Sequence, residues 1–505
     1  MTGLASNALI GVVGAGAMGA GIAQVAAQAG HRVKLHDARP GAAAQAIAAI
    51  DQRLSARVAA GKLAGDARLA LIANLDPCDQ LEGLADANLV IEAIVEDLAI
   101  KRDLFAQLEA LCGPTCILAS NTSSLSITRL AAGLNRPERL AGLHFFNPAP
   151  VMALVEVVSG LGTAPAVAQV LYDTAKAWGK TPVRARSTPG FIVNRVARPF
   201  YAENLRLLQE GVASCATLDA LLREAGGFAM GAFELTDLIG QDVNYAVTCA
   251  VFEAYFQDRR FVPSLIQQEL VAAGHLGRKS GQGFYFYGPG ASRPEPAALQ
   301  GEGTLPLCVA EGVPALLQPL LARLRGAGVR VTERPGSGLL RLGEAVVALS
   351  DGRMACQRAQ QHGLPNLVLL DLALDYTRAQ RLGISWAEGC TQAALTQVAV
   401  VLGAAGIVAT PLSDSPAMAV LRTVAMLANE AADACLHGVA SAADLDTAMR
   451  AGVNYPIGPL AWADRLGVGY LVQVLDNLQA AYGEERYRPS LLLQRCLAQG
   501  RPLHD

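Results

Sequence analysis

The sequence ALIGVVGAGAMGAGIAQVAAQAGHRVKLHDARP, residues 8–40, decides the fold. The apolar run LIGVV predicts a buried strand, the alanine-rich stretch after it predicts a helix, and RVKLHD predicts a second strand. Gly14, Gly16 and Gly19 form the pattern G-x-G-x-x-G between the first strand and the helix. Asp37 lies at the end of the second strand, 18 residues after Gly19. This order of strand, glycine-rich turn, helix and acidic residue predicts a parallel α/β sheet that binds a dinucleotide.

Each part of this motif has a physical role. The first glycine makes the tight turn, the second lets the backbone approach a pyrophosphate, and the third lets the helix pack closely on the strand. The first turn of the helix presents free N–H groups and a positive dipole to the anion. The loop residues expected to contact the cofactor are Gly14, Gly16, Ala17, Met18 and Gly19.

Asp37 predicts which dinucleotide binds. Its carboxylate would accept hydrogen bonds from the ribose hydroxyls and would repel a 2′-phosphate, which favours NAD over NADP. Arg39, two residues later, is the one feature that argues for NADP. The alternative for the whole motif is an alanine- and glycine-rich helical hairpin without a ligand.

The composition excludes several classes of protein. The chain has 505 residues, of which 52% are hydrophobic and 17% charged, which indicates about three to four folded domains and no disordered chain. The net charge of −3 gives no basic surface for nucleic acid and no polybasic patch for a membrane. The stretches 7–30 and 391–413 are free of charge and long enough to span a bilayer, but Gly, Gln, Thr or Pro interrupts them. Buried α/β elements fit them better.

Cysteine usage predicts the compartment. The ten cysteines are scattered, no CxxC pair occurs, and a zinc site needs tighter clusters with histidine partners. We therefore expect no metal site and reduced thiols. The first ten residues lack Lys and Arg, which argues against a secretory signal. A cytoplasmic location is the resulting prediction.

Loops at the carboxyl ends of further strands are expected to line the ligand crevice. Apolar strands are predicted near 89–91 and 116–119. Glu96, Lys101 and the polar loop 120–124 follow these strands and so fall where a cofactor and a substrate would lie. Each of them, taken alone, could equally be a solvated surface residue.

The stretch LAGLHFFNPAPVMALVEVV, residues 140–158, is almost wholly apolar and yet carries two ionisable side chains, His144 and Glu156. His144 ends a predicted strand and Glu156 lies on the next one. Neighbouring strands can bring the two together, and the carboxylate would then orient the imidazole as a general base near neutral pH. Such a pair suits proton removal from an alcohol whose hydride goes to NAD. The alternative is that His144 is a structural core residue whose hydrogen bonds are all made, and that Glu156 lies at the surface.

Seven motifs follow one another in the first part of the chain. They are GAGAMG, IEAIVEDLAIK, SNTSSLSI, HFFNPAPVMALVEVV, TPGFIVNR, GFAMGAFELTDLIGQD and GRKSGQGFYFY. In this order and combination, the chain resembles the L-3-hydroxyacyl-CoA dehydrogenases over roughly residues 7–287. The resemblance implies a Rossmann domain followed by a helical domain, an acyl-CoA substrate, and NAD-dependent oxidation of a (3S)-3-hydroxyacyl-CoA to the 3-oxoacyl-CoA.

The resemblance also implies roles for single residues. His144 would take the proton of the 3-hydroxyl group, and Glu156 would orient it. Ser123 and Asn194 would hydrogen-bond the substrate oxygen and stabilise the charge that builds there. Lys62 lies near the position of a family lysine that binds the CoA nucleotide phosphate. The positions that match NAD contacts in the family are Glu96, Lys101, Ser123, Asn147 and Lys279.

The chain departs from the family pattern at two places in the helical domain. Ala229 and Ala232 stand where the family often has proline. Because proline restricts the backbone, the stiffness of this loop is expected to differ. Neither position carries chemistry.

The second half contains a repeat of the helical domain. The pairs that share an offset of 227 are Pro189 with Pro416, Arg195 with Arg422, Glu203 with Glu430, Gly231 with Gly458, Asp237 with Asp464 and Gly240 with Gly467. The sequence GVAS at 211–214 also recurs at 438–441. One constant register over some 50 residues argues against chance. Leu421 stands at the position of Asn194, and neither a second glycine triplet nor a second His–Glu pair precedes it.

We therefore expect an α/β plus all-α chain of five segments. They are an NAD-binding Rossmann domain at 1–187, a helical domain at 188–287, a linker rich in Pro and Gly at 288–304, a reduced Rossmann-like domain at 305–412 and a second helical copy at 413–505. The apolar runs NLVLLDLAL and VAVVLGAAGIVAT, spaced by helical stretches, indicate the reduced domain. This layout resembles the tandem bacterial members of the family, which include 3-hydroxybutyryl-CoA dehydrogenases and the 3-hydroxyadipyl-CoA enzymes of phenylacetate breakdown.

The repeat bears on assembly and on the alternative functions. Helical domains of this family typically pair across a two-fold axis between subunits, so a second copy in one chain can take the partner's place as an internal pseudo-dimer. A homo-oligomer is a further option. A non-catalytic NAD-binding or structural protein on the same fold is the alternative function. A bifunctional hydratase–dehydrogenase has no support, because the repeat accounts for much of the second half.

Overall fold

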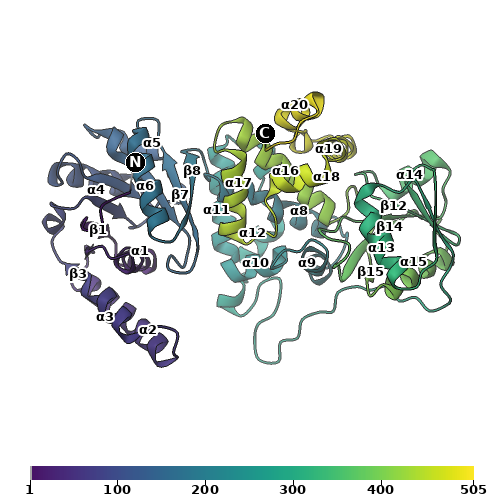
Figure 1. The fold of residues 1–505 in the computed structure, drawn as a ribbon, viewed down its shortest axis with the longest axis horizontal. Coiled ribbons are helices and arrows are strands. Elements are labelled where there is room, and N and C mark those ends of the chain that lie inside the picture. The colour runs from purple at the N-terminus through teal and green to yellow at the C-terminus, as the bar shows by residue number, and fades with distance from the viewer. Residues whose placement is uncertain (1–2, 505) are drawn as a thin grey trace. The chain divides into compact units, whose positions relative to one another are not determined.

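The computed structural model describes residues 3–504, which divide into two compact units (Figure 1). The first unit holds the described residues up to Arg195 together with His437–Val453. The second holds Val196–Leu436 and the described residues from Asn454 onward. Each unit contains one large β-sheet.

The sheet of the first unit has eight strands in the order β3-β2-β1-β4-β5-β6-β7-β8. All neighbours in it are parallel except β6 and β7, which are antiparallel. The strands are β1 (Ile10–Val13), β2 (Val33–His36), β3 (Leu75–Cys78), β4 (Leu89–Glu92), β5 (Ile117–Ser120), β6 (Leu140–Phe145), β7 (Leu154–Ser159) and β8 (Thr181–Arg186). The strand order changes direction at β1, and ligands bind at such a point in open α/β sheets.

The helices of the first unit connect and cover these strands. They are α1 (Ala17–Gln28), α2 (Ala42–Ala59), α3 (Gly65–Ala73), α4 (Leu98–Leu111), α5 (Ile127–Ala131), α6 (Pro165–Ala177) and α17 (Ala442–Val453). The short helix α7 (Val193–Val196) runs over the boundary of the two units. Helix α1 ends where the sequence expects it, because Gly30 (φ 96°) reverses the chain and its N–H bonds back to the helix.

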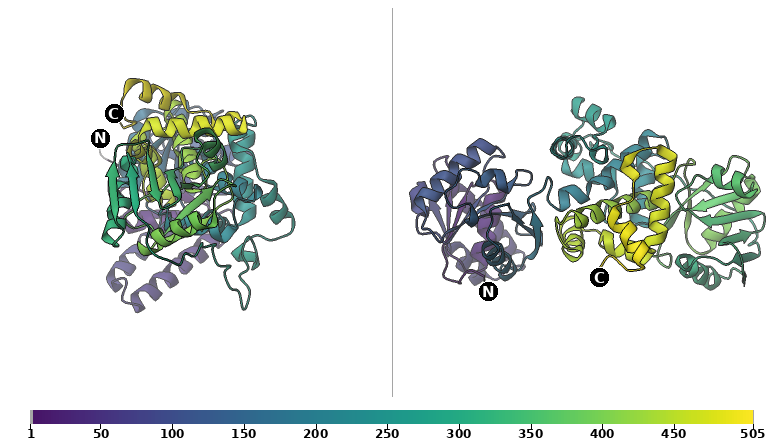
Figure 2. Two further views of the ribbon diagram at one scale, coloured as in Figure 1. Left: turned by 90° about the vertical axis from the view of Figure 1, so that its right-hand side faces the viewer. Right: turned by 90° about the horizontal axis from the view of Figure 1, so that it is seen from above.

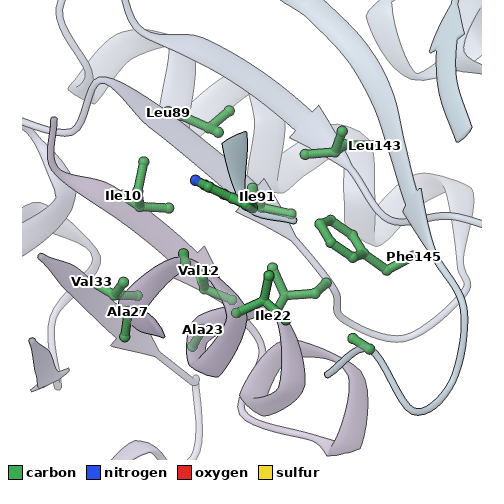
Figure 3. Close-up of a cluster of buried hydrophobic side chains, with 14 of the residues drawn as sticks. Ile10, Val12, Ile22, Ala23, Ala27, Val33, Leu89, Ile91, Leu143 and Phe145 are labelled. Atoms are coloured by element: carbon green, nitrogen blue, oxygen red, sulfur yellow. The ribbon is translucent and has the colours of Figure 1, made fainter. Parts of the chain in front are cut away.

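The core of the first unit lies between α1 and the middle of the sheet (Figure 3). Ile10, Val12 and Ile22 are fully buried there, together with Leu89 and Ile91 from the neighbouring strand. Burying such a side chain contributes about 1.5–3 kcal/mol. Because β1 and α1 pack tightly in this core, the glycine-rich turn between them is held in a fixed position.

Helix α17 is the contribution of the C-terminal part of the chain to the first unit. It packs against β7 and β8, and β8 is the edge strand of the sheet. The N–H of Arg186 on β8 donates a hydrogen bond of 2.8 Å to the carbonyl oxygen of Val439, just before the helix. Because unpaired edge strands invite pairing with other chains, this helix also protects the edge.

The second unit combines two sets of helices with a second sheet (Figure 2). Its helices before the sheet are α8 (Arg198–Gln209), α9 (Cys215–Glu224), α10 (Ala232–Ile239), α11 (Gln241–Ala254) and α12 (Leu265–Ala272). Its helices after the sheet are α16 (Val420–Leu436), α18 (Pro459–Leu466), α19 (Val468–Tyr482) and α20 (Leu491–Gln499). Helices α8 and α16, one from each set, pack against each other.

The second sheet has seven strands in the order β10-β9-β11-β12-β13-β14-β15. They are β9 (Cys308–Glu311), β10 (Val331–Arg334), β11 (Leu339–Leu342), β12 (Ala345–Leu349), β13 (Leu367–Leu370), β14 (Arg381–Trp386) and β15 (Val408–Pro411). Its helices are α13 (Gln318–Gly326), α14 (Ala355–His362) and α15 (Gln392–Ala404). The run NLVLLDLAL contains β13, whereas VAVVLGAAGIVAT is the end of α15 followed by β15. The sheet is mixed, since β11 and β14 run antiparallel to their neighbours β12 and β13.

The predicted fold class is confirmed. A Rossmann-like sheet, helical domains and a second, smaller α/β sheet are all present. Residues 288–307 follow an irregular path, the long loop of Figure 1, and Leu299 on it bridges to Ala409 of β15. Among the described residues, no helix is both long and apolar enough to cross a membrane.

Candidate active site

The glycine-rich turn leaves open space at the N-terminus of α1. A Cβ on Gly14 (φ 106°) would lie 2.5 Å from the carbonyl oxygen of Ala93, and a Cβ on Gly19 would lie 1.8 Å from that of Gly14. A Cβ on Gly16 would meet no atom within 4 Å. The turn therefore requires glycine at 14 and 19 for its own packing, whereas Gly16 faces the space that a pyrophosphate needs.

Asp37 follows β2 and faces the same turn. Its Oδ2 accepts a hydrogen bond of 2.8 Å from the N–H of Ala15, and its Oδ1 accepts from the N–H and the Nε of Arg39 at 3.0 and 3.2 Å. Burial raises the pKa of Asp37, but the hydrogen bonds from Ala15 and Arg39 and the charge of Arg39 outweigh burial and lower it. The carboxylate is therefore ionised at neutral pH, and Arg39 is ion-paired with it.

A cleft of about 470 Å³ lies beside the turn. Gly16 and Ala17 form one wall, and Asn147 another. Arg53 and Arg57 of α2, one helical turn apart and both exposed, line it as well. These two arginines were not predicted as site residues, although their i, i+4 spacing on a helix just after Asp37 is visible in the sequence.

Glu96 organises the polar loop after β5. Its Oε1 accepts hydrogen bonds from Thr122 Oγ1 at 2.6 Å, from Ser124 Oγ at 2.9 Å, and from the N–H groups of Ser123 and Ser124 at 3.1 and 3.2 Å. Burial raises the pKa of Glu96, but the hydrogen bond from Thr122 and the charge of Lys101 outweigh it, so the pKa is lowered. An ionised carboxylate thus holds the loop in one conformation.

Lys101 lies beneath this loop and not at its surface. Its side chain is 1% exposed, and Nζ lies 2.5 Å from Glu92 Oε1 and 3.1 Å from Glu96 Oε2. Glu92 is also buried and accepts a hydrogen bond of 2.7 Å from Ser120 Oγ. The sequence placed Lys101 near the cofactor, but its burial could not be foreseen, because the pattern does not show which way a helical lysine turns.

His144 and Glu156 are direct cross-strand partners on the antiparallel strands β6 and β7. His144 Nδ1 and Glu156 Oε2 are 2.7 Å apart, and both side chains are buried. Glu156 Oε1 accepts hydrogen bonds of 3.1 and 3.0 Å from the N–H groups of Ile192 and Val193 at the start of α7. Because a carboxylate only accepts hydrogen bonds, Nδ1 carries the proton and Nε2 is the nitrogen available for chemistry.

Aromatic rings enclose the imidazole. Phe146 and Phe191 lie with ring centroids 4.5 and 6.0 Å from that of His144. Phe191 adopts a left-handed backbone (φ 46°), which is uncommon for a non-glycine residue. This conformation turns the chain so that the next two N–H groups point at Glu156.

Ser123 and Asn194 lie near each other in the first unit. Asn194 is on α7, and its Nδ2 lies 3.5 Å from the carbonyl oxygen of Ser123. Asn121, in the same loop as Ser123, accepts a hydrogen bond of 2.8 Å from the N–H of Phe145, next to His144. The loop is thereby tied to the strand of the histidine.

Two of the expected lysines lie apart from these groups in the chain. Lys62 is exposed in the turn between α2 and α3. Lys279 belongs to the second unit, where its Nζ forms an ion pair of 2.6 Å with Asp242. Among the described residues, no cluster of three His, Cys, Asp or Glu side chains could hold a metal ion.

The second unit contains a junction that matches the one around Glu156. Asp371, after β13, accepts hydrogen bonds of 3.0, 2.8 and 3.0 Å from the N–H groups of Ala419, Val420 and Leu421 at the start of α16. Ala419 and Val420 stand 227 residues after Ile192 and Val193, which donate to Glu156. The acid–helix contact is thus repeated without a histidine beside it, a relation that the sequence pattern did not predict.

A dinucleotide loop and a buried histidine–carboxylate pair on one sheet are features of nucleotide-dependent oxidoreductases. The family profile of the 3-hydroxyacyl-CoA dehydrogenase NAD-binding domain matches residues 9–188. The profile of the C-terminal domain of the same family matches twice, at 190–287 and 418–503. The profile of the 3-hydroxybutyryl-CoA dehydrogenase reduced Rossmann-fold domain matches residues 347–416.

Similar proteins cover either the whole chain or its first half. The 3-hydroxyadipyl-CoA dehydrogenase of Escherichia coli K12 is 47% identical over 97% of each chain. The crystal structure of a 3-hydroxybutyryl-CoA dehydrogenase from Escherichia coli K12 covers 98% of this chain and 99% of its own, with a TM-score of 0.89 and 45% identity. A 3-hydroxybutyryl-CoA dehydrogenase of Clostridioides difficile is 38% identical over 55% of this chain and 99% of its own length.

The chain belongs to the 3-hydroxyacyl-CoA dehydrogenase family and is an NAD-dependent oxidoreductase. The predictions of the family, of the enzyme class and of NAD as the cofactor are confirmed. The turn agrees with this cofactor, since Gly16 leaves room for a pyrophosphate and Asp37 presents an ionised acceptor for a ribose.

Proposed function

We propose that His144 is the general base that removes the proton from the 3-hydroxyl group of a (3S)-3-hydroxyacyl-CoA. The observation that carries this proposal is the buried contact of 2.7 Å between His144 and Glu156, with the second oxygen of Glu156 held by two backbone N–H groups. That arrangement fixes the ring, keeps the proton on Nδ1 and leaves the lone pair of Nε2 to accept a proton. NAD, when bound, accepts the hydride from C3.

We infer that Ser123 and Asn194 hold the substrate oxygen. A hydroxyl and an amide N–H can both donate to an oxygen that is becoming a carbonyl, and donors placed before the reaction stabilise the developing charge in either direction. The 3.5 Å approach of Asn194 Nδ2 to the Ser123 carbonyl supports a shared site. Asn121 and Glu96 hold the loop that carries Ser123.

We infer that the cofactor contacts come from the glycine turn, Asp37, Glu96 and Asn147. Asn147 lines the cleft beside the turn, and Glu96 keeps the neighbouring loop in place. Lys101 would act through Glu96, because its ammonium group is buried against two carboxylates. Lys279 is proposed as a cofactor contact because its position matches such a contact in the family.

Arg53 and Arg57 supply the local positive charge that a phosphate-bearing substrate needs. They line the cleft beside the turn on an exposed face of α2, and Lys62 follows on the same hairpin. Two or three cations near one surface attract a nucleotide phosphate even in a chain of net negative charge. Together they are the proposed contact for the CoA nucleotide.

The names of the relatives support a proposal for the acyl group of the substrate. The full-length relative from Escherichia coli K12 is named for 3-hydroxyadipyl-CoA, and the full-length crystal structure from the same strain is named for 3-hydroxybutyryl-CoA. We therefore expect a short acyl chain of about four to six carbons.

Consumption of NADH with acetoacetyl-CoA tests the reaction directly. The wild-type chain should oxidise NADH only when the thioester is present, and His144→Ala should lower the rate about 1,000-fold. A non-catalytic NAD-binding protein on the same fold would bind NADH without turnover. Binding of NADH with no turnover on any 3-oxoacyl-CoA of four to six carbons would therefore reject the enzymatic roles in favour of that alternative.

We also propose that the two helical copies form an internal pseudo-dimer. In the second unit, Arg486 lies 3.8 Å from Glu203, and Arg260 lies 3.4 Å from Glu430. Glu203 and Glu430 are equivalent by the repeat, and both arginines belong to the related segments RRFVPSL and ERYRPSL. Each copy thus presents an arginine to the glutamate of the other, as a two-fold interface requires.

We also propose the five segment boundaries given above and a cytosolic location. None of the ten cysteines, all of them among the described residues, takes part in a disulfide bond, which fits a reducing compartment. Limited proteolysis tests the boundaries, since cleavage is expected first within 288–304, where the chain is irregular and carries many Pro and Gly residues.

A further inference from the structure

A cavity of about 210 Å³ lies entirely within the second unit. Its wall follows α8 and is completed by residues of α11, by the first turn of α12 and by Arg486 from the second helical copy. At roughly 30 Å³ for a water-sized group, the cavity has room for about seven such groups. It is therefore large enough for a small organic molecule.

The charged side chains that line this cavity, as far as the described chain supplies them, are those of Arg198, Arg206 and Arg486. Arg206 and Arg486 each lie 3.4 Å from a carboxylate oxygen of Glu484. Arg486 also lies 3.8 Å from Glu203. Two of the three positive charges are therefore balanced by acids, and the third decides what the cavity can bind.

Arg198 has no acid partner within residues 3–504. It is 5% exposed, its Nη1 donates to Thr248 Oγ1 at 3.0 Å, and its guanidinium carbon lies 4.8 Å from the ring centre of Tyr201. Its Nε is buried and has no hydrogen-bond partner in the described part of the chain. Burial lowers the pKa of Arg198, but a guanidinium in a protein stays protonated, so the charge persists. A buried charge without a counter-ion is costly unless a ligand supplies one.

Ser264 adds a second polar group without a partner to the same wall. It directly precedes α12, and its Oγ is buried and makes no hydrogen bond to any described residue. The first turn of α12, which is described throughout, contains no acidic residue that would neutralise the positive end of the helix dipole. A hydroxyl and a helix N-terminus beside a guanidinium favour an anion with oxygen acceptors.

The rest of the wall is largely apolar. Leu205 and Phe261 line it as buried side chains, whereas Val262 and Leu265 line it with 38% and 66% of their surfaces exposed. A ligand that covers these side chains gains about fourfold in affinity for each CH₂ group that it buries. The ligand that fits both parts of the wall thus has an anionic head and a short apolar chain.

We propose that this cavity binds a small monocarboxylate with a short alkyl chain, whose carboxylate pairs with Arg198 and whose chain packs against Phe261 and Leu265. The carboxylate supplies the counter-ion that Arg198 lacks, and it can accept two parallel hydrogen bonds from the planar guanidinium. Ser264 Oγ is a further donor to the same group. The inference does not depend on the proposed dehydrogenase reaction, because it uses residues of the second unit alone.

Three probes test the chemistry of the site on the full-length chain. Pentanoate has seven non-hydrogen atoms, pentanamide has the same shape without the charge, and inorganic phosphate has the charge without the alkyl chain. A molecule that binds the folded chain alone raises its melting temperature, and the dependence on concentration gives the Kd. Pentanoate should bind at least about tenfold more tightly than the other two. Equal binding of pentanamide or of phosphate would overturn the proposal.

Substitutions locate the binding. Arg198→Met should weaken the binding of pentanoate about 30-fold, because hydrogen bonds to a charged group are lost. Its melting temperature without ligand should not fall below that of wild type by more than about 2 °C, because a buried charge without a counter-ion has been removed. Ser264→Ala should weaken the binding about threefold. A purely structural arginine would give the opposite result, a lower melting temperature with an unchanged Kd, and that result would reject the site.

Two further variants complete the test. Arg358→Met removes an arginine of the reduced domain that is 14% exposed and lies 3.5 Å from Asp351, and it should leave the Kd of pentanoate within about twofold of wild type. Arg198→Lys keeps the charge but loses the two-pronged geometry, so it should weaken the binding about tenfold and serves if Arg198→Met does not fold. Unchanged binding of pentanoate in a folded Arg198 variant would overturn the inference.

Discussion

At the scale of single residues, the reactivity of the site depends on how the two oxygens of Glu156 are used. One binds the imidazole and the other binds the start of α7, so the acid has no freedom to turn away. We expect His144→Ala to lower kcat about 1,000-fold because a placed general base contributes roughly 10² to 10⁴. Glu156→Gln should cost less, since the base itself remains.

Titration with NAD provides the control for these two variants. The glycine turn and Asp37 do not touch either residue, so the dissociation constant of NAD should stay within about threefold of wild type. Near-normal turnover of His144→Ala would contradict the assignment of the base.

Asp37 carries a second prediction at this scale. Asp37→Ser should weaken NAD binding and narrow the preference over NADP, because an acceptor for the ribose and a charge that repels the 2′-phosphate are lost together. The variant also releases Arg39 from its ion pair, which favours the phosphate further. The ratio of kcat/KM for the two cofactors is the measurement, and equal use of both by wild type would refute the role of Asp37.

The sequence was most informative where one residue type is dictated by geometry. The glycines of the turn and the cross-strand pair of His144 with Glu156 could be foreseen, because a period of two and the known turn leave few choices. The burial of the Lys101 side chain could not be foreseen, since it depends on how α4 packs against the sheet. Arg53 and Arg57 were not singled out, because an arginine on a helix is usually a solvated surface residue.

At the scale of elements, β1, α1 and β2 agree with the sequence to within a residue or two. The order of the strands does not follow from the sequence, because it is set by contacts between segments that are far apart in the chain. The same holds for α17, which the repeat assigns to the second helical copy and which packs against β7 and β8. A local pattern predicts that a helix forms but not the surface that it covers.

The start of α16 gives a prediction for an element. Asp371→Ala should lower the free energy of unfolding by about 3 kcal/mol, because three buried N–H groups lose their acceptor. Turnover per folded molecule should stay close to wild type, since Asp371 belongs to the junction without a histidine. Urea unfolding measures the first quantity and NADH consumption the second.

Asp476 on α19 offers a matched control. It is exposed on the same unit, and Asp476→Ala should change stability by less than about 0.5 kcal/mol. If Asp371→Ala were as mild as this control, the carboxylate would not be the cap of α16.

At the scale of the molecule, buried ion pairs and hydrogen bonds connect the two helical sets of the second unit. Glu203 accepts a hydrogen bond of 2.8 Å from Arg422 Nε, and Tyr487 donates to the same carboxylate at 2.9 Å. Glu203→Gln should lower the free energy of unfolding by about 1–3 kcal/mol, because the buried Arg422 loses one of its two carboxylate partners and keeps Glu210 at 3.0 Å. Chemical unfolding at neutral pH is the measurement.

The pH dependence of this pair has a definite sign. Burial raises the pKa of Glu203, but the charges of Arg422, Arg486 and Arg206 outweigh it and hold the pKa below 4.5. The stabilisation is therefore complete above pH 4.5 and is lost as the pH falls through the lowered value. Wild type should lose stability more steeply than Glu203→Gln below pH 4.5, and parallel curves would contradict this role.

Truncation after residue 287 tests the role of the repeat. The fragment keeps the NAD-binding strands but loses α16 from the face of α8 and α17 from the edge strand β8. Exposed apolar helices and an open sheet edge promote association, so the fragment should aggregate or form a homodimer. Its activity should fall because its folded state is less stable. Light scattering decides, and a soluble, fully active monomer would reject the pseudo-dimer.

The position of α17 in the chain has a consequence for synthesis. The ribosome completes Arg195 roughly 260 residues before it completes Val453, the last residue of the first unit. At about 5–20 residues per second, this delay lasts roughly 10 to 50 seconds. During that time the nascent NAD-binding sheet has emerged with β8 uncovered. We therefore expect the growing chain to be open to pairing at this sheet edge, and slow translation of the second half would prolong the exposure.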